Sequence, residues 1–249
     1  SAQVVSSPIL ALPYKYMEES IKKDANGKDF VIHTQVDDWV FVLPEIANAQ
    51  VNVSPEYLQR GIYQSVVYNS KMHIHGRFGN IDWDNINVDS KSINWSQAKL
   101  ILGVLDVKGL SVPPKISFAN QDYGVQINGQ LFKIFPNNII ADLKLSKEED
   151  LTASYAISYE LKGSKSFNFL PLANQNKLDI KGSWGHPSFN GGYLPDHREV
   201  QDSAFSAVWN IPSFGRKLAP YWVGQREIYQ FQDVNLSEET MDYFSEENV

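Results

Sequence analysis

The histidines His73 and His75 are the residues whose spacing could most directly support chemistry. They lie two positions apart in a stretch with period-two alternation, so both imidazoles fall on one face of a predicted strand. Such a pair can bind one metal ion, but zinc sites in proteins use three or four ligands at defined spacings. The nearest carboxylates in the sequence, Asp82 and Asp84, do not complete such a pattern. We therefore expect no metal and no other cofactor.

The same strand face also carries Lys71 and Arg77, so basic or titratable side chains follow one another along it. At ~3.3 Å per residue this stripe is about 20 Å long. It could contact an anionic partner such as lipid headgroups or an acidic protein. The alternative is a solvated strand face whose neighbours supply Asp and Glu. We favour that alternative because the outward face of an antiparallel sheet is usually polar.

A further histidine, His186, lies in a loop beside Trp184, and His197 and Glu199 follow it. A histidine–carboxylate pair such as His186 with Glu199 could act as a general base. No nucleophile motif accompanies the pair, because the sequence has neither Gly-x-Ser-x-Gly nor cysteine. We interpret His186 and Trp184 as hydrogen-bonding residues that fix a long loop. The sequence predicts no catalytic residue.

Oxygen-rich and aromatic residues also gather in predicted loops. Residues 82–85 and 87–89 are rich in Asp and Asn but lack the spacing of a calcium-binding hand, so we interpret them as turn residues. Exposed aromatic side chains could form a platform for sugar rings. The alternative function is therefore a carbohydrate-binding or carbohydrate-active β-sandwich, by analogy of fold alone. The candidate aromatic residues are Trp83, Trp95, Tyr221 and Trp222.

The composition is that of an ordinary globular chain and excludes several classes of protein. The 249 residues carry a net charge of −7, which disfavours nucleic-acid binding. There is no cysteine, so disulfides and thiolate chemistry are excluded. The longest apolar runs, 39–43 and 100–105, are strand-sized, whereas a membrane helix needs about 20 apolar residues. We expect no membrane span and no signal peptide within these residues.

Alternation of apolar and polar residues recurs along the chain and predicts half-buried strands. In residues 66–78 one face carries Val66, Tyr68, Met72, Ile74 and Phe78. The same period appears in residues 155–161, 177–184 and 205–211.

Two Asn-Gly pairs predict hairpin turns, because both central residues of a type I′ turn need positive φ. Asn26-Gly27 precedes the strand-like residues 29–36, and Asn128-Gly129 would join residues 125–127 to residues 130–134. Such closely spaced strands and turns are typical of an all-β protein.

Helical signals are few and short: one after Ser54, one over residues 94–98 and one over residues 237–241. No Ser- or Pro-rich linker interrupts the series of strands. We predict an all-β fold, a large two-sheet antiparallel β-sandwich with a few short helices, in a single domain over residues 1–249.

The loop at residues 184–195 (WGHPSFNGGYLP) is unusual because it crowds Gly, which is conformationally free, next to Pro, which is restricted. Three further blocks precede it in a fixed order. Together the four blocks resemble the CreD family of bacterial inner-membrane proteins, called cell-envelope integrity proteins, over about residues 7–214. The three other blocks are residues 7–14 (SPILALPY), residues 60–68 with 76–78 (RGIYQSVVY and GRF), and residues 98–104 (AKLILGV) with Asp106, Gly109 and Leu110.

The resemblance implies a location and a role. Family members begin with a membrane helix and end in several more, so residues 1–249 would be an extracytoplasmic domain that faces the periplasm from the inner membrane. Its partners would be its own membrane helices and an envelope protein or lipid headgroups, with no nucleic acid. The role would be structural or interactive rather than enzymatic, in envelope integrity and, in some bacteria, in a two-component response. The resemblance supplies no site residue.

The resemblance also leads to an expectation about the chain ends. The residues near Ser7 and near Val249 should both face the membrane, since each would connect to a membrane helix. We expect the surface around them to expose apolar side chains, among them Ile9, Leu10, Leu12 and Tyr14. That stretch is too short to span a bilayer, so in a domain without its membrane helices it should pack onto the sheet, contact a neighbouring molecule or be disordered.

Overall fold

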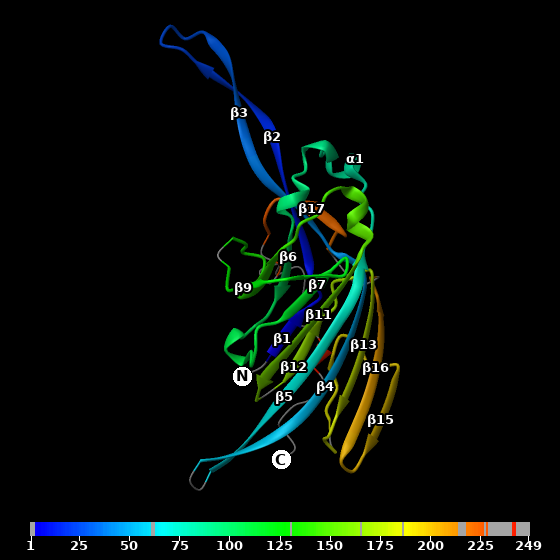
Figure 1. Ribbon diagram of the computed structural model, residues 1–249. Helices are drawn as coiled ribbons and strands as arrows, with labels where there is room; N and C mark the ends of the chain where they lie inside the picture. Colours follow the sequence, from blue (N-terminus) through cyan, green and yellow to red (C-terminus); the bar gives the residue numbers. More distant parts are fainter. Residues whose placement is uncertain are drawn as a thin grey trace.

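The computed structural model describes residues 3–60, 63–129, 131–164, 166–185, 187–213, 218–226, 228 and 241–242. Strands dominate this part of the chain and form sheets of eight, six and four strands (Figure 1). The all-β prediction is confirmed. The four-stranded sheet is an addition to the predicted two-sheet sandwich.

The eight-stranded sheet is antiparallel except for the parallel pair of β13 with β4. Its strands, in spatial order, are β15 (His197–Gln201), β16 (Ala204–Pro212), β13 (Gln175–Gly182), β4 (Pro44–Arg60), β5 (Tyr63–Phe78), β11 (Ser154–Gly163), β7 (Lys115–Phe118) and β8 (Gln121–Tyr123).

The six-stranded sheet is antiparallel throughout. Its order is β17 (Tyr221–Val223), β3 (Asp29–Val42), β2 (Ile9–Lys23), β6 (Lys99–Gly103), β10 (Asn138–Asp142) and β9 (Val125–Ile127). The four-stranded sheet has the order β1 (Gln3–Ser6), β12 (Phe167–Leu170), β18 (Met241–Asp242) and β14 (Asn190–Gly191).

The helices of the described residues are single turns, in agreement with the sequence. The predicted helix at residues 94–98 is the 3-10 turn η2. The helix predicted after Ser54 is wrong, because the residues that follow it continue β4 in register with β5. Pairing with a distant strand there outweighs a local capping signal. The helices are α1 (Trp83–Ile86), η1 (Ser90–Ser92), η2 (Trp95–Gln97), η3 (Val107–Gly109) and η4 (Glu148–Thr152).

The two Asn-Gly turns differ in outcome. Gly27 has a φ of +81° in the turn between β2 and β3, as a hairpin requires. Asn128 also has a positive φ, but the strand that pairs with β9 is β10 and not residues 130–134. The predicted short hairpin at that position is therefore wrong. Most of the helix predicted at residues 237–241 lies outside the described residues.

The main core lies between the eight-stranded sheet and one face of the six-stranded sheet. The eight-stranded sheet buries one face and exposes the other, so its strands alternate as predicted. On β11, for example, Tyr155, Ile157 and Tyr159 are buried, while the residues between them face outward. The same alternation holds along β16, from Phe205 to Ile211.

The six-stranded sheet is buried on both faces near its centre, since a second apolar cluster covers its other side. Ile9, Leu10 and Leu12 of β2 are fully buried, and Tyr14 is nearly so. The expectation that these four side chains form an exposed apolar surface is therefore wrong, and of the three alternatives for this stretch the structure has packing within the sheet. A continuous apolar run without alternation marks a strand that is covered on both faces.

Two long ribbons extend beyond the core at opposite ends of the molecule (Figure 1). The β2–β3 ribbon is paired from Leu10 with Val42 out to Lys23 with Asp29. The β4–β5 ribbon is paired out to Arg60 with Tyr63. No helix of the described residues is long and apolar enough to cross a membrane.

The first and last described strands flank β12. β1 runs parallel to β12 and β18 runs antiparallel to it, so Gln3 and Asp242 both lie toward the Phe167 end. Val4 and Asp242 are both paired with Asn168, and two strand spacings place them ~10 Å apart. The predicted position of Val249 lies outside the described residues.

Candidate functional site

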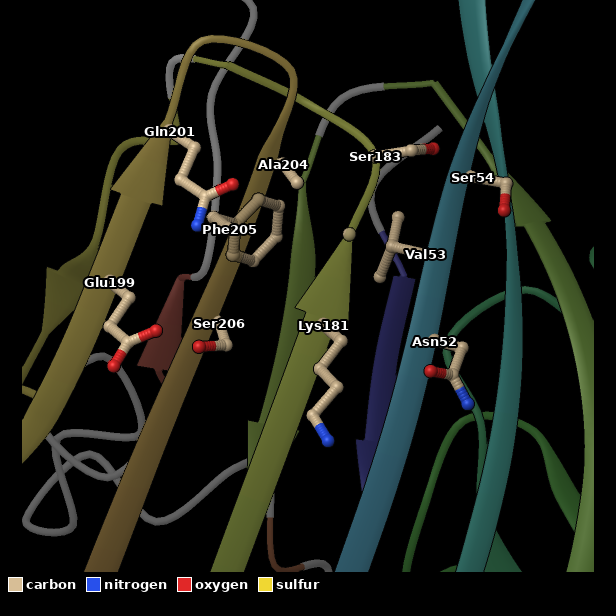
Figure 2. A pocket seen from close by; sticks show the side chains of 11 residues that line it. Asn52, Val53, Ser54, Lys181, Ser183, Glu199, Gln201, Ala204, Phe205 and Ser206 are labelled. Atoms are coloured by element: carbon tan, nitrogen blue, oxygen red, sulfur yellow. The ribbon is translucent and has the colours of Figure 1, made fainter.

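The solvent face of the eight-stranded sheet contains two adjoining hollows that share Asn52. We call them together the polar groove. The first has a volume of about 420 Å³ and crosses β15, β16, β13 and β4. In Figure 2, Glu199, Lys181 and Asn52 line it from three of these strands. Its other lining residues include Ser54, Ser183, Gln201 and Ser206.

The second hollow has a volume of about 380 Å³ and continues across β4, β5, β11 and the start of β7. Strand register explains why the two hollows join. Lys181 pairs with Asn52 on β4, and Asn52 pairs with Lys71 on β5. The polar groove is therefore formed by outward positions of strands that lie far apart in the sequence. The second hollow is lined by Gln50, Asn52, Lys71, His73, Lys115, Ser158 and Glu160, among others.

Charges in the polar groove are only partly paired. Lys71 Nζ lies 3.5 Å from Glu160 Oε1, and both side chains are exposed. An exposed ion pair of this kind contributes little to stability. Lys181 forms no ion pair within the described part of the chain. Lys71, His73 and Arg77 are exposed on this face of β5, and Glu160 of the neighbouring strand compensates part of the charge, as the favoured interpretation of a solvated strand face expects.

His73 lies in the second hollow and contacts a hydroxyl group. Its Nδ1 is 2.9 Å from Ser158 Oγ. A serine–histidine contact can support nucleophilic catalysis when a third group orients the imidazole and N–H groups stabilise an oxyanion. No carboxylate of the described residues hydrogen-bonds His73. The strands β5 and β11 are paired with neighbours on both sides, so their backbone N–H groups there donate to adjacent strands and are not available to stabilise an oxyanion.

His75 lies one pleat further along β5, with its ring centroid 5.6 Å from that of His73. Burial, and then the nearby His73, lower the pKa of His75. Its Nδ1 is buried and has no hydrogen-bond partner in the described structure. No group of three His, Asp or Glu side chains with metal-binding geometry occurs in that part of the chain. That no metal binds remains a prediction.

The loop at residues 184–195 packs against β16. The Phe189 ring lies edge-on to Phe205 and Trp209, with centroid distances of 5.9 and 5.6 Å. Trp209 Nε1 donates to the Tyr193 carbonyl at 3.2 Å. Trp184 is half-buried against the main core. These contacts agree with a structural role for the loop.

His186 lies outside the described residues, so its predicted structural role stays a prediction. Glu199 is an exposed residue of β15 and lines the first hollow. His197 lies two positions before Glu199 on β15 and is paired with Val208 of β16. It shares the outward face with Glu199.

The oxygen-rich loops are helix caps. The Asp82 carboxylate accepts from the Asn85 backbone N–H at 3.4 Å at the start of α1. The Asp89 carboxylate accepts from the Lys91 N–H at 3.0 Å at the start of η1. Both side chains satisfy free backbone donors of the first turn, as expected for turn residues.

The four candidate aromatic residues do not form an open platform. Trp222 is 4% exposed and stacks on Phe41 at 5.6 Å. Trp83 and Trp95 pack edge-to-face at 6.1 Å and are half-buried against the core. The Trp83 Nε1 donates to Glu148 at 2.6 Å. The hydroxyl of the partly buried Tyr221 accepts from the Asp82 N–H at 3.3 Å. Side chains engaged in this way leave no flat aromatic surface for a sugar ring.

The polar groove is the feature that analysis of the sequence missed. Outward polar positions were predicted strand by strand, but the order of the strands was not. The parallel pairing of β13 with β4 places Lys181 next to Asn52 across more than a hundred residues of chain, and no short-range signal indicates that pairing. Chemically, the polar groove offers amides, ammonium groups and carboxylates to a polar ligand.

Comparison with known proteins identifies relatives. Residues 1–247 match the model of the protein family described as "Inner membrane protein CreD". The inner membrane protein CreD of Escherichia coli (strain K12) is 24% identical over 230 residues, which cover 87% of this chain and 46% of that protein. The chain therefore spans about half the length of this relative.

Among solved structures, an M1 zinc metallopeptidase from Deinococcus radiodurans aligns over 70% of this chain and 41% of its own. The identity is 7% and the TM-score is 0.30. A mutant of that enzyme bound to a Tyr-Ser-Ala substrate gives 8% identity and a TM-score of 0.32. Likeness at this level carries no information on the activity of the chain.

Proposed function

The chain belongs to the CreD family of inner membrane proteins, and on that premise we propose that it forms a non-enzymatic periplasmic domain with a structural or protein-interaction role in cell-envelope integrity. The observation that carries this proposal is the placement of β1 and β18 on either side of β12. Gln3 of β1 and Asp242 of β18 lie at the same end of one sheet.

Two strand ends ~10 Å apart suit a domain that is held to one membrane face by both of its ends. Adjacent membrane helices pack at about 8–10 Å, so flanking helices could continue from β1 and β18 side by side. About half of the E. coli relative lies outside the region that matches this chain, which leaves length for such helices. Under this proposal the other end of the molecule, with the β2–β3 ribbon, points away from the membrane.

The polar groove supports an interactive role over a catalytic one. It crosses strands of a rigid sheet and offers hydrogen-bonding and charged side chains along its length. Its serine–histidine contact lacks an orienting carboxylate within the described residues. We propose that the polar groove meets an envelope partner, while the end near β1 and β18 meets the membrane helices of the same protein.

Cysteine accessibility in cells tests the location. The chain has no cysteine, so a single one can be introduced into the full-length protein at the exposed position Ile21. A maleimide that does not cross the inner membrane should label Ile21→Cys in cells whose outer membrane alone is permeabilised. A matched Leu10→Cys, which is fully buried, should react only after denaturation. Labelling of Ile21→Cys only after lysis of the inner membrane would contradict a periplasmic location.

Growth under envelope stress tests the role. Leu10→Asp buries a charge in the core and should unfold the domain, so cells that carry it should become more sensitive to detergent. Ile21→Asp lies on the exposed ribbon and should leave growth unchanged. Equal growth of both strains and of cells that lack the gene would show that the domain has no part in envelope integrity.

A further inference from the structure

The core-facing side of the β4–β5 ribbon stays apolar after the ribbon leaves the core. On β4 this side passes from buried Val53 through half-buried Pro55 to Tyr57, which is 63% exposed. Half-buried Val66 lies directly opposite Tyr57 on β5. Leu58, on the other side of the ribbon, is 36% exposed. Apolar side chains therefore extend onto both sides of a projecting ribbon, where a surface outside the domain could cover them.

The ribbon projects from the end of the molecule at which Gln3 of β1 lies. Tyr68 Oη donates to the Ser166 carbonyl at 2.8 Å, and the same carbonyl accepts from the Gln3 N–H at 2.9 Å. Gln3 is therefore level with Tyr68, and the ribbon continues from there to the pair of Arg60 with Tyr63. About five further residues at ~3.3 Å each carry it ~17 Å past Gln3. Figure 1 shows the ribbon running below the strand β1.

We propose that this projecting end of the β4–β5 ribbon, at Tyr57 and Leu58, contacts the interfacial layer of the lipid bilayer. The proposal rests on the proposed function, in which flanking membrane helices continue from β1 and β18. A ribbon that reaches ~17 Å past Gln3 touches the bilayer surface even when the sheet stands off from it by that distance.

The chemistry of the ribbon fits the interfacial layer and limits the depth it reaches. Tyr has an apolar ring and a polar hydroxyl, and tyrosine is enriched where a bilayer meets water. The outer edges of the ribbon past Tyr68 have no partner strand within the described residues, so their N–H and C=O groups need water or headgroups. The hydrocarbon core offers neither. The ribbon therefore ends in the headgroup region, which is about 5–8 Å thick on each side.

The β2–β3 ribbon provides the matched comparison. It also exposes apolar side chains, with Ile21 at 73% and Val31 at 51%, but it lies at the opposite end of the molecule. If exposure alone caused membrane contact, both ribbons would bind. If orientation decides, only the β4–β5 ribbon contacts lipid.

The absence of cysteine allows the experiment to use one probe at a time. The 249-residue chain carries an environment-sensitive NBD label at Leu58→Cys or at Ile21→Cys. An N-terminal histidine tag holds it on vesicles of phosphatidylethanolamine and phosphatidylglycerol that contain a nickel-chelating lipid. We expect a blue shift and a roughly two-fold rise in emission at position 58, with quenching by doxyl-labelled lipid, because the probe leaves water. Position 21 should show neither change. Tyr57→Cys is the second probe site, in case Leu58→Cys fails to fold.

Each other outcome overturns the proposal in a different way. Unchanged emission from the probe at both positions 58 and 21 shows that the β4–β5 ribbon does not reach lipid. The periplasmic location is tested separately by maleimide labelling, so this outcome does not contradict it. A change at position 21 alone shows that the opposite end faces the membrane, which also contradicts the proposed function. In the full-length protein, a blue-shifted probe at position 58 that doxyl lipid does not quench shows that the ribbon packs on protein helices instead.

Discussion

Tyr68 lies directly opposite Gly163 across the β5–β11 pairing, and its phenol group fills the space that a side chain at position 163 would need. This contact between Tyr68 and Gly163 lies at the last pair of β5 with β11, where the β4–β5 ribbon leaves the core. Tyr68 is 1% exposed and donates to Ser166, so its ring has little freedom to move. Glycine at position 163 is thus required by close packing.

Replacement of Gly163 with Ala should therefore destabilise the domain. A Cβ there would clash with the buried Tyr68 ring, and overpacking of this kind costs about 1–3 kcal/mol. Gly124→Ala is the control, because nothing lies within 4 Å of a Cβ at that position. Urea denaturation of both variants measures the difference. Equal stability of the two variants would show that the Tyr68 ring moves aside at no cost.

Alkaline pH should weaken the fold through its buried tyrosines. Burial raises the pKa of Tyr159 well above its usual value, and it also raises the pKa of Tyr155. The folded state therefore favours the neutral phenol. The stability that these two phenols contribute is complete below the unfolded pKa of about 10 and is lost as the pH rises above it.

Tyr159→Phe should reduce this alkaline loss. At neutral pH the variant should lose less than about 1 kcal/mol, since the one hydrogen bond that the hydroxyl donates within the described residues goes to the weak acceptor Met72 Sδ. Tyr57→Phe, at an exposed site, should leave the profile unchanged. Thermal unfolding between neutral pH and pH ~11 provides the measurement. Identical alkaline profiles for Tyr159→Phe and the parent chain would contradict the argument.

Acid pH should weaken the fold through His75. Burial and the neighbouring His73 lower its pKa, so the fold favours the neutral imidazole. The residues beside it across the sheet are Asn48 and Ala156, and neither supplies a negative charge. The stability that the neutral His75 contributes is present above the unfolded pKa of about 6.5 and is lost as the pH falls through the lower folded value.

His75→Gln should therefore flatten the decline in melting temperature below pH ~6.5. His197→Gln, on the exposed edge strand β15, is the matched control and should keep the decline. If both variants follow the parent chain, other groups cause the acid sensitivity.

Zinc should bind weakly or not at all. His73 and His75 are adjacent on one face, but a stable site needs three or four ligands, and no such group occurs in the described residues. Titration calorimetry with zinc should show no stoichiometric binding in the micromolar range. Stoichiometric binding that His73→Ala abolishes would identify a site to which the pair contributes.

The sequence predicted best those strands that lie between core and solvent. The alternation of β5, β11 and β16 follows directly from the one-sided burial of the eight-stranded sheet, so residue type and burial agree at nearly every position. Polar positions of the candidate site, such as Lys71 and His73, were placed on the correct face for the same reason.

The remaining features depend on long-range pairing, which leaves no local pattern. The pairing of β13 with β4 forms the first hollow, and the pairing of β1 with β12 begins the third sheet. Both pairs are parallel, so no hairpin turn marks them in the sequence. The capping signal at Ser54 misled for a related reason, because β5 holds the residues after it in a strand.

Two isoleucines of β2 test the corrected view of the N-terminal apolar run. Ile9 is fully buried in the second apolar cluster, on the face of the six-stranded sheet that turns away from the main core, whereas Ile21 is 73% exposed on the ribbon. Ile9→Ala should cost about 2–5 kcal/mol, because it removes buried methyl groups and leaves a cavity. Ile21→Ala should change stability by less than about 0.5 kcal/mol. The two variants share residue type, strand and substitution, so burial alone separates them. Urea denaturation of the two chains decides the matter: a small effect at Ile9 would mean that residues 9–14 are peripheral, as a membrane-facing apolar surface would require.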